Sequence, residues 1–449
     1  MTSKLPTGER GIYLADEEAK LSFKVFDADH HFYPPDDAQT RHLEKKFFGR
    51  AFLPGESAIV EGDEDDAPAE AHKTADEILL DQKQVDAQTW RTVGEHPVPE
   101  GGHGGIDFSD IPAMETNIPI PGAMLNKLNP MRDLDKLSRA ELVARYNEMR
   151  PAFEKKEPRL ALMDIQGVQA AVIHPLGGGG ESAFARNDVE AGYAVARAFN
   201  RWIEEDWAYN YLDRIYVPAA IPLADVDMAV AELERVLALG AKFVNLVPGP
   251  AWYGRSPFDP YFDPFWARIN ESETRIAIHL GAGYIRHGAE WGEDPKAAYS
   301  QYNGFQWFSY WSDRPIMETI AAMIFHGLFQ RFPKVKVLIA EFGTIWLPYT
   351  LRKLDHAAML GRRPKFAPKL AGRPSSIFKE HCVIAPYPEE NVSRVMEVTG
   401  TDCLVFGSDF PHAEGLPDPI QYAAMLKGLD ENIIRKMMRD NLAAFLGQG

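Results

Sequence analysis

Short apolar runs alternate with helical patterns from about residue 160 to the end of the chain. Apolar runs bounded by turn residues predict strands, and their alternation with helices predicts parallel β-α-β units. With one further run near the start, the predicted strands cover residues 24–29, 169–174, 214–221, 241–246, 274–279, 334–341, 381–385 and 403–408. Eight parallel strands can close into a barrel, so the predicted fold class is α/β, a (β/α)8 TIM barrel.

The clearest helical patterns fill the gaps between these strands. Asn187 or Asp188 is a suitable N-cap for the helix predicted at 188–210, and Gly240 is a typical C-terminal stop for the helix predicted at 225–239. Apolar residues at helical spacing predict helices over residues 188–210, 225–239, 315–332 and 430–446.

Residues 33–137 interrupt the alternation and form a long insertion after the first strand. The insertion contains an acidic run at 61–66, which is typical of a disordered linker, and a glycine-rich stretch at 101–105. Its segment 111–131 contains proline and methionine and is expected to be an ordered lid or an interface arm. The length of 449 residues fits one barrel domain, residues 1–449, that carries this insertion.

Composition restricts the class of partner. The net charge of −17 repels phosphate backbones, so we expect no nucleic-acid partner. No apolar run approaches the roughly 20 residues of a membrane span, and the N-terminus lacks the apolar core of a secretory signal. Cys382 and Cys403 both lie in apolar surroundings, which predicts two buried thiols. We therefore expect a cytoplasmic protein that acts on a small molecule.

Several predicted strands end in residues that bind metals. Asp29 and His31 are two apart on one strand, so their side chains point to the same side, while His30 points away. His279 ends the fifth predicted strand, and Asp409 follows the eighth. A barrel brings strand ends together, so these four residues predict a site for one divalent metal, Zn²⁺ or Mn²⁺, with Fe²⁺ as an alternative.

Other polar residues are candidates for catalysis or substrate binding at the same end. Glu341 ends the sixth strand, where it can transfer a proton, orient water or form a salt bridge. Asp409 can also act as a general base, and His412 follows it by three residues. His174 and Asn245 end the second and fourth strands and are candidate pocket residues. Three tryptophans can each either line a pocket at this end or pack in the core: Trp307, Trp311 and Trp346.

Motifs of several other enzyme classes are missing from the sequence. There is no Gly-x-Ser-x-Gly elbow, no Walker loop and no His-Glu-x-x-His, which disfavours serine hydrolases and kinases. The glycines at 177–180 lack the spacing of a dinucleotide fingerprint and are expected to form a loop.

With these residues in hand, the chain resembles the amidohydrolase-related family that includes aminocarboxymuconate-semialdehyde, resorcylate and carboxyvanillate decarboxylases. The resemblance covers the first strand and then about residue 155 to the C-terminus, and it is carried by residues 163–168, 262–268, 332–348 and 407–412. It implies metal ligands at the positions of Asp29, His31, His279 and Asp409, and it implies a dimer.

The chain departs from that family in three ways. Glu341 stands where the better-studied decarboxylases have a histidine. Relatives with an aspartate at position 29 often have a glutamate at the position of Pro34. The insertion after the first strand is longer than in compact members.

The resemblance implies non-oxidative decarboxylation of an aromatic or unsaturated carboxylic acid. Metal-dependent hydrolysis of a C–N, C–O or C–C bond uses the same kind of site, and Glu341 in place of histidine favours it. A third alternative is the metal-binding subunit of a two-subunit oxygenase, similar to the aminoisobutyrate hydroxylases, which Pro34 permits. The first two alternatives suit a homodimer, and the third predicts a complex with a paralogous subunit.

Overall fold

The structure is a computed structural model. It describes residues 21–35, 37–51, 139–175, 179–180, 183–184, 187–280, 291–292, 305, 308, 313–362, 364–388, 390–412, 415–416, 418–426 and 428–448. The predicted insertion lies largely outside these residues, including the acidic run, the glycine-rich stretch and the segment 111–131. Its described beginning contains η1 (Lys45–Phe47) and α1 (Phe48–Ala51).

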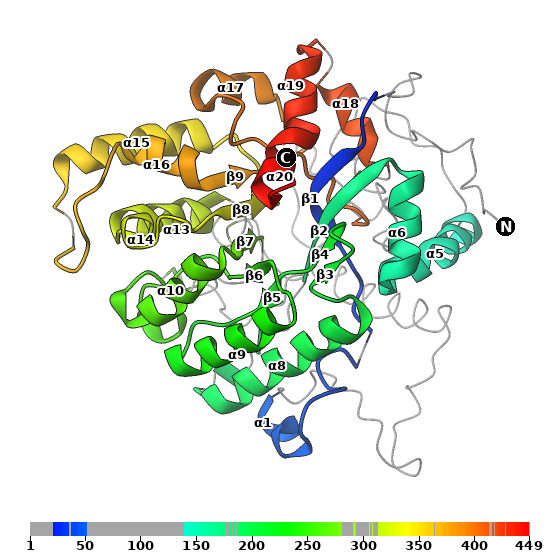
Figure 1. The fold of residues 1–449 in the computed structure, drawn as a ribbon, viewed down its shortest axis with the longest axis horizontal. Helices are drawn as coiled ribbons and strands as arrows, with labels where there is room; N and C mark the ends of the chain where they lie inside the picture. The colour runs from blue at the N-terminus through cyan, green and yellow to red at the C-terminus, as the bar shows by residue number, and fades with distance from the viewer. Residues whose placement is uncertain are drawn as a thin grey trace, which may run out of the picture.

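Two sheets of mostly parallel strands form the centre of the described fold (Figure 1). The first has the order β1-β2-β4-β3, in which only the short edge strand β3 is antiparallel. The second has the order β5-β6-β7-β8-β9 and is parallel throughout. The strands are β1 (Val25–His31), β2 (Val168–His174), β3 (Asn210–Tyr211), β4 (Ile215–Tyr216), β5 (Ala219–Ala220), β6 (Phe243–Asn245), β7 (Arg275–His279), β8 (Val337–Ala340) and β9 (Cys382–Ile384).

Residues 404–410 run between the two sheets and hydrogen-bond to both. Leu404 forms an isolated bridge with Ile384 of β9, and Phe410 forms one with His30 of β1. The Ala28 amide also donates to the Phe406 carbonyl over 2.8 Å. The strand predicted at 403–408 therefore lies between β9 and β1, but it pairs through single bridges and not as a continuous ladder.

The strand predicted at 214–221 is interrupted. It appears as β4 and β5, separated by Val217 and Pro218. Proline has no amide hydrogen, so Pro218 cannot donate to a neighbouring strand, and the ladder breaks there. The break also divides the two sheets from each other.

Helices surround the strands on the outside of the molecule (Figure 1). The N-cap side chains of Asp188 and Asp225 accept hydrogen bonds from the amides of Ala191 and Met228, which confirms Asp188 as the N-cap of α8. The main helices are α5 (Arg139–Glu154), α6 (Lys156–Ile165), α8 (Val189–Asp206), α9 (Val226–Ala238), α10 (Asp263–Ser272), α13 (Asp313–Phe325), α15 (Leu347–Leu360), α16 (Pro374–His381) and α17 (Val392–Thr399).

Two predicted helices are each divided. The one at 315–332 splits into α13 and α14 (Leu328–Arg331) because Gly327 adopts a φ of 73°. The one at 430–446 consists of α19 (Glu431–Arg435), the π-helical turn η7 (Lys436–Asp440) and α20 (Asn441–Leu446). The remaining short elements are η3 (Trp252–Gly254), η4 (Pro260–Phe262), η6 (Pro419–Gln421) and α18 (Tyr422–Met425).

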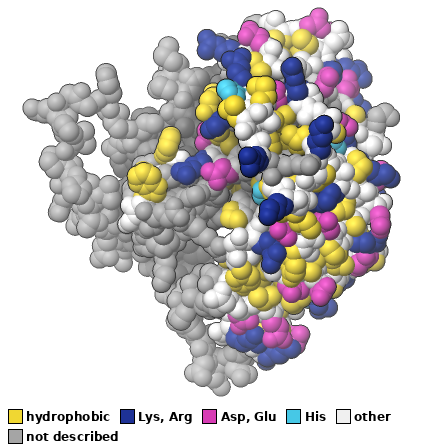
Figure 2. Space-filling view, turned by 90° about the vertical axis from the view of Figure 1, so that its left-hand side faces the viewer, with side chains coloured by type: hydrophobic (Ala, Val, Ile, Leu, Met, Phe, Trp, Pro, Cys, Tyr) yellow, Lys and Arg dark blue, Asp and Glu magenta, His cyan; other side chains and the backbone are white. Residues whose placement is uncertain are grey.

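The main core lies between the strands and the surrounding helices. It buries Trp202, Trp207 and Trp266 completely, and the thiols of Cys382 and Cys403 are free and buried as predicted. None of the described helices is long and apolar enough to cross a bilayer. On the face shown in Figure 2, lysine and arginine side chains are interspersed with acidic and apolar ones.

Buried residues of the strands are expected to contribute strongly to stability. Ile339 of β8 is fully buried, so Ile339→Ala should cost about 3 kcal/mol through lost burial and an unfilled cavity. The matched change Ile345→Ala, at a side chain that is 73% exposed, should cost less than about 0.5 kcal/mol. Chemical denaturation of both variants tests this, and equal losses would contradict the assignment of the core.

Candidate metal centre

Strand β1 delivers two ligand-type side chains to one point. Asp29 and His31 are both buried, and His31 Nε2 lies 3.3 Å from Asp29 Oδ1. The register of β1 against β2 shifts between Asp27 and His30, which marks an irregularity that re-aims the side chains at the end of the strand.

Three further strand ends converge on the same point. His279, the last residue of β7, places Nε2 3.3 Å from Asp29 Oδ1 and 2.8 Å from Glu341 Oε2. Glu341 directly follows β8. Asp409 arrives from the segment between β9 and β1, and its Oδ1 lies 3.2 Å from His31 Nε2. The four predicted metal ligands and Glu341 therefore lie together.

Backbone hydrogen bonds define which imidazole nitrogens face this group. His279 Nδ1 lies 2.8 Å from the Leu280 carbonyl, and His31 Nδ1 lies 3.3 Å from the His174 carbonyl. A carbonyl oxygen only accepts, so each Nδ1 carries the hydrogen. Nε2 is therefore the ring nitrogen that faces the carboxylates in both residues, as it does in many metal-binding histidines.

The converging atoms are buried and lack conventional partners within the described part of the chain. Asp29 Oδ1, His31 Nε2, His279 Nε2 and Asp409 Oδ1 each have no hydrogen-bond partner there. The contact of His279 Nε2 with Glu341 Oε2, over 2.8 Å, is an ion-pair contact. Buried polar atoms in this state are costly unless something else satisfies them. Carboxylate and imidazole donors in this arrangement fit a divalent ion.

The donor atoms form two overlapping sets, within each of which all atoms lie within 4.8 Å of one another. Both sets contain His31 and Glu341. The imidazole of His31 has one lone pair at Nε2, so it can serve only one ion. The complete group comprises Asp29, His31, His279, Glu341, Asp409 and His412.

Two of the carboxylates stand on strained backbone. Glu341 and Asp409 have φ values of 59° and 57°, which residues other than glycine rarely adopt. The Tyr387 hydroxyl donates to the Glu341 carbonyl over 2.7 Å, and the Asp409 amide donates to the Asp29 carbonyl over 2.8 Å. These contacts hold both turns, and the turns aim both side chains at the centre.

His412 covers one side of the group. Its ring stacks on His31 with centroids 3.9 Å apart and an interplanar angle of 11°. Its Nδ1 lies 2.7 Å from Asp409 Oδ1. The predicted catalytic residue His412 therefore contacts one candidate ligand and packs against another.

The predicted substrate-binding residues occupy different environments. His174 Nε2 donates to the Ala28 carbonyl over 2.8 Å and lies 4.0 Å from Asp29 Oδ1, so His174 borders the group. Asn245 ends β6, and its Oδ1 has no hydrogen-bond partner in the described ranges. Trp346 is in the main core, where its indole donates to the Phe342 carbonyl. Trp307 and Trp311 lie outside the described residues.

Burial and mutual charge shift the acidities of the group. Burial lowers the pKa of His31 to about 3, with the charge of His412 contributing, and it lowers that of His174 to about 3 together with the charge of His279. Burial raises the pKa of Asp409. Burial alone would lower the pKa of His279 and raise that of Asp29. The neighbouring carboxylates of Glu341 and Asp29 outweigh burial at His279, so its pKa rises. The imidazoles of His279 and His31 outweigh burial at Asp29, so its pKa falls.

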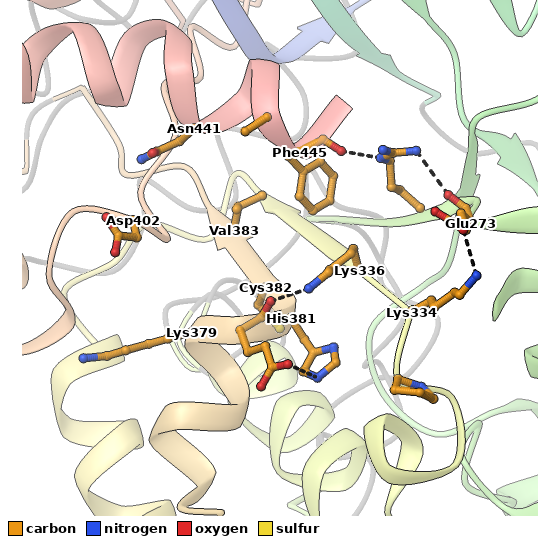
Figure 3. Close-up of a pocket in the computed structure, with 14 residues that line it drawn as sticks. Glu273, Lys334, Lys336, Lys379, His381, Cys382, Val383, Asp402, Asn441 and Phe445 are labelled. Carbon is orange, nitrogen blue, oxygen red and sulfur yellow. Dashed lines mark hydrogen bonds and ion pairs between the residues drawn. The ribbon is translucent and has the colours of Figure 1, made fainter. Parts of the chain in front are cut away.

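A separate pocket of about 460 Å³ lies elsewhere (Figure 3). It is lined by Arg275 and Cys382, the first residues of β7 and β9, and therefore opens at the opposite end of the strands from His279. Its lysines are engaged, since Lys334 pairs with Glu273 and Lys336 donates to the Glu380 carbonyl. We therefore take the converging side chains, and not this pocket, as the candidate functional site.

The chain belongs to the amidohydrolase family, whose profile matches residues 26–448. It is 26% identical over 273 residues to gamma-resorcylate decarboxylase of Rhizobium sp. (strain MTP-10005). The aligned region covers 57% of this chain and 76% of that protein. It is 24% identical over 233 residues to 2-amino-3-carboxymuconate-6-semialdehyde decarboxylase of Dictyostelium discoideum, covering 51% and 60%. The predicted family and the prediction of a metal-dependent amidohydrolase-superfamily enzyme are thereby confirmed.

Solved structures agree on the fold. An amidohydrolase of Mycobacterium avium subsp. paratuberculosis K-10 matches with a TM-score of 0.70 and 31% identity, over 95% of this chain and all of that one. The manganese-bound 5-carboxyvanillate decarboxylase of Novosphingobium aromaticivorans matches with a TM-score of 0.51 and 17% identity, over 75% and 91%. At that identity the second match supports the α/β fold alone.

Loss of one carboxylate should empty the site. Asp409→Asn should reduce bound transition metal from about one ion per chain to almost none, because a neutral amide is a much weaker ligand. Elemental analysis of the purified chain measures this, and circular dichroism checks the fold. Asp402→Asn, at a side chain 80% exposed and paired with Lys436, is the matched control and should retain the metal. Unchanged metal in Asp409→Asn would contradict the site.

Proposed function

We propose that this protein is a metal-dependent enzyme that decarboxylates an aromatic or unsaturated carboxylic acid without an oxidant. The observation that carries the proposal is the set of buried, convergent donor atoms on Asp29, His31, His279 and Asp409 that lack hydrogen-bond partners among the described residues. The decarboxylases among its relatives support the reaction class. A mixed oxygen and nitrogen donor set suits Zn²⁺ or Mn²⁺, and Fe²⁺ is the alternative.

We propose that the strands of this protein close into a (β/α)8 barrel. The parallel order of the two sheets supports it, as do the hydrogen bonds that residues 404–410 make to both β9 and β1. In such a barrel the carboxyl ends of the strands form the active site. We further propose a homodimer, which light scattering tests.

When bound, the divalent ion would act as a Lewis acid on a substrate oxygen. The protein residues around it would supply orientation and proton transfer. Decarboxylation replaces a carboxylate on the substrate carbon by hydrogen and releases carbon dioxide, so a proton must reach that carbon. A positioned side chain is needed to deliver it.

Glu341 is our candidate for this proton transfer. Its side chain is 12% exposed, so its carboxylate reaches the edge of the buried group, while Oε2 lies 2.8 Å from His279 Nε2. His412 and Asp409, 2.7 Å apart, form a second pair that can hold a proton beside the substrate. His174 and Asn245 are candidates for orienting the substrate, because each carries a polar atom without a hydrogen-bond partner in the described structure.

Hydrolysis of a C–N, C–O or C–C bond is the second candidate function. The observation that favours it is Glu341 at the rim of the group, because a carboxylate there can take a proton from attacking water. Product analysis separates the two reactions: carbon dioxide with retention of all other atoms indicates decarboxylation, and incorporation of water indicates hydrolysis. A chain that is inactive alone and active with a paralogous chain would instead indicate the oxygenase subunit.

Removal of the charge on Glu341 should separate catalysis from metal binding. In Glu341→Gln, turnover of the best substrate found among carboxylated aromatics should fall by about 100-fold or more, because the amide cannot transfer the proton. Metal content should stay at the wild-type level. The measurements are steady-state kinetics and elemental analysis.

Glu380→Gln is the matched control, because that side chain is 71% exposed and lies at the opposite end of the strands. It should retain wild-type turnover. Unchanged turnover in Glu341→Gln would show that Glu341 has no catalytic role, and loss of metal in that variant would make it a ligand instead.

A further inference from the structure

A second buried carboxylate, on Asp27, lies directly behind the candidate ligands. Asp27 is completely buried in β1, two residues before Asp29. Its Oδ1 accepts hydrogen bonds from the amide of Asp29 over 3.1 Å and from the amide of Ser408 over 3.0 Å. Those amides belong to two different segments of the chain.

These two hydrogen bonds connect the segments that carry three of the four proposed ligands. One segment is the end of β1, with Asp29 and His31, and the other runs through Ser408 into Asp409. The segments approach closely here: a Cβ added at Gly407 would lie 2.8 Å from Asp29 Cβ. Asp27 therefore bridges a point at which a small shift between segments would change the distance between Asp29 and Asp409.

The other oxygen of Asp27 belongs to a buried chain of hydrogen bonds. Oδ2 accepts from His30 Nε2 over 3.0 Å, and His30 Nδ1 accepts from the Arg159 guanidinium over 3.4 Å. Both His30 and Arg159 are completely buried. The carboxylate and the guanidinium thus compensate each other's charge through the imidazole between them.

Arg159 also fixes the backbone of the ligand strand. It donates to the carbonyl of His31 over 2.6 Å and to the carbonyl of Ala152 over 2.7 Å, and its guanidinium packs over the rings of Trp207 and Phe410. The network therefore links β1 to α6 through Arg159 and to the segment at Ser408 through Asp27.

We propose that Asp27 is a positioning residue for the metal centre, and that its contacts to Asp29, Ser408 and His30 define the separation of the ligand-bearing segments. Asp27 is not itself a ligand, because both of its oxygens are used by amides and by His30. This inference rests on the proposed function only in assuming that a divalent ion binds at Asp29, His31, His279 and Asp409.

The network should be intolerant of even an isosteric change. In Asp27→Asn, the amide oxygen can still accept from the two backbone amides, but the NH2 group then faces the Nε2 hydrogen of His30. A switch of the His30 tautomer would relieve that conflict and create a new one, because Nδ1 would then present a hydrogen to Arg159. Neither arrangement satisfies every group, so the two segments should shift.

The test is Co²⁺ binding to the full chain, measured as affinity by chelator competition and as the visible ligand-field spectrum of the bound ion. Asp27→Asn should weaken Co²⁺ binding by about 10- to 100-fold and change the spectrum, because supporting residues typically have this effect on metal sites. A purely structural role would lower thermal stability and leave the spectrum unchanged.

Asp206→Asn is the matched control. Asp206 is also a buried aspartate in a charged network, with Lys155, Arg41 and Trp202, but it does not contact the ligand-bearing segments. Its variant should lose stability and keep the wild-type Co²⁺ affinity and spectrum. If Asp27→Asn does not fold, His30→Gln, which leaves the amide contacts of Asp27 intact, should show a smaller change in the same direction.

The outcomes separate the two claims. Wild-type protein that binds no Co²⁺ overturns the proposed function and this inference with it. Wild-type binding together with wild-type affinity and spectrum in Asp27→Asn overturns the positioning role alone. Equal changes in Asp27→Asn and Asp206→Asn also overturn it, because the effect would then follow from general destabilisation.

Discussion

The site is governed by the free energy of burying several carboxylates together. Asp29, Asp409 and Glu341 all direct oxygens into one small region, and two of them are less than a tenth exposed. Buried charges of like sign cost several kcal/mol each unless opposite charge compensates them. Protons on the neighbouring imidazoles or a bound cation can supply that charge. The acidity shifts follow from the first arrangement, with His279 holding a proton and Asp29 ionised.

The fold supports this arrangement because it brings the ends of several parallel strands to one edge of the sheets. β1, β7 and β8 bring Asp29, His279 and Glu341 to one edge, as parallel strands do. The left-handed turns at Glu341 and Asp409 then direct side chains that would otherwise continue along the strands. Such strained turns need support from the surrounding structure, and here hydrogen bonds from Tyr387 and to the Asp29 carbonyl provide it. Gly407 permits the close approach that completes the site.

Much of this arrangement could be predicted from the sequence, because strand ends in a parallel α/β fold meet whatever their separation along the chain. Asp29, His31, His279 and Asp409 lie up to 380 residues apart in the sequence, yet each lies at or just after the end of a predicted strand. The orientation of His30 away from the candidate ligands was likewise predictable from the alternation of side chains along a strand. Helix α8 and its cap at Asp188 followed from local chemistry.

Other features depend on tertiary packing and could not be predicted. Arg159 belongs to a helical pattern in which an arginine normally faces solvent, and nothing local indicates that it is completely buried against His30. The role of Trp346 in the core was not distinguishable from a pocket role, because aromatic residues serve both. The break at Pro218 and the split at Gly327 were visible as residue types, but whether each interrupts an element depends on its surroundings.

The most direct test of metal binding by these four side chains is anomalous diffraction from crystals of the metal-loaded protein. One strong anomalous peak should lie about 2.0–2.3 Å from oxygen atoms of Asp29 and Asp409 and from Nε2 of His31 and His279. A peak elsewhere, or none in protein that elemental analysis shows to be loaded, would contradict it.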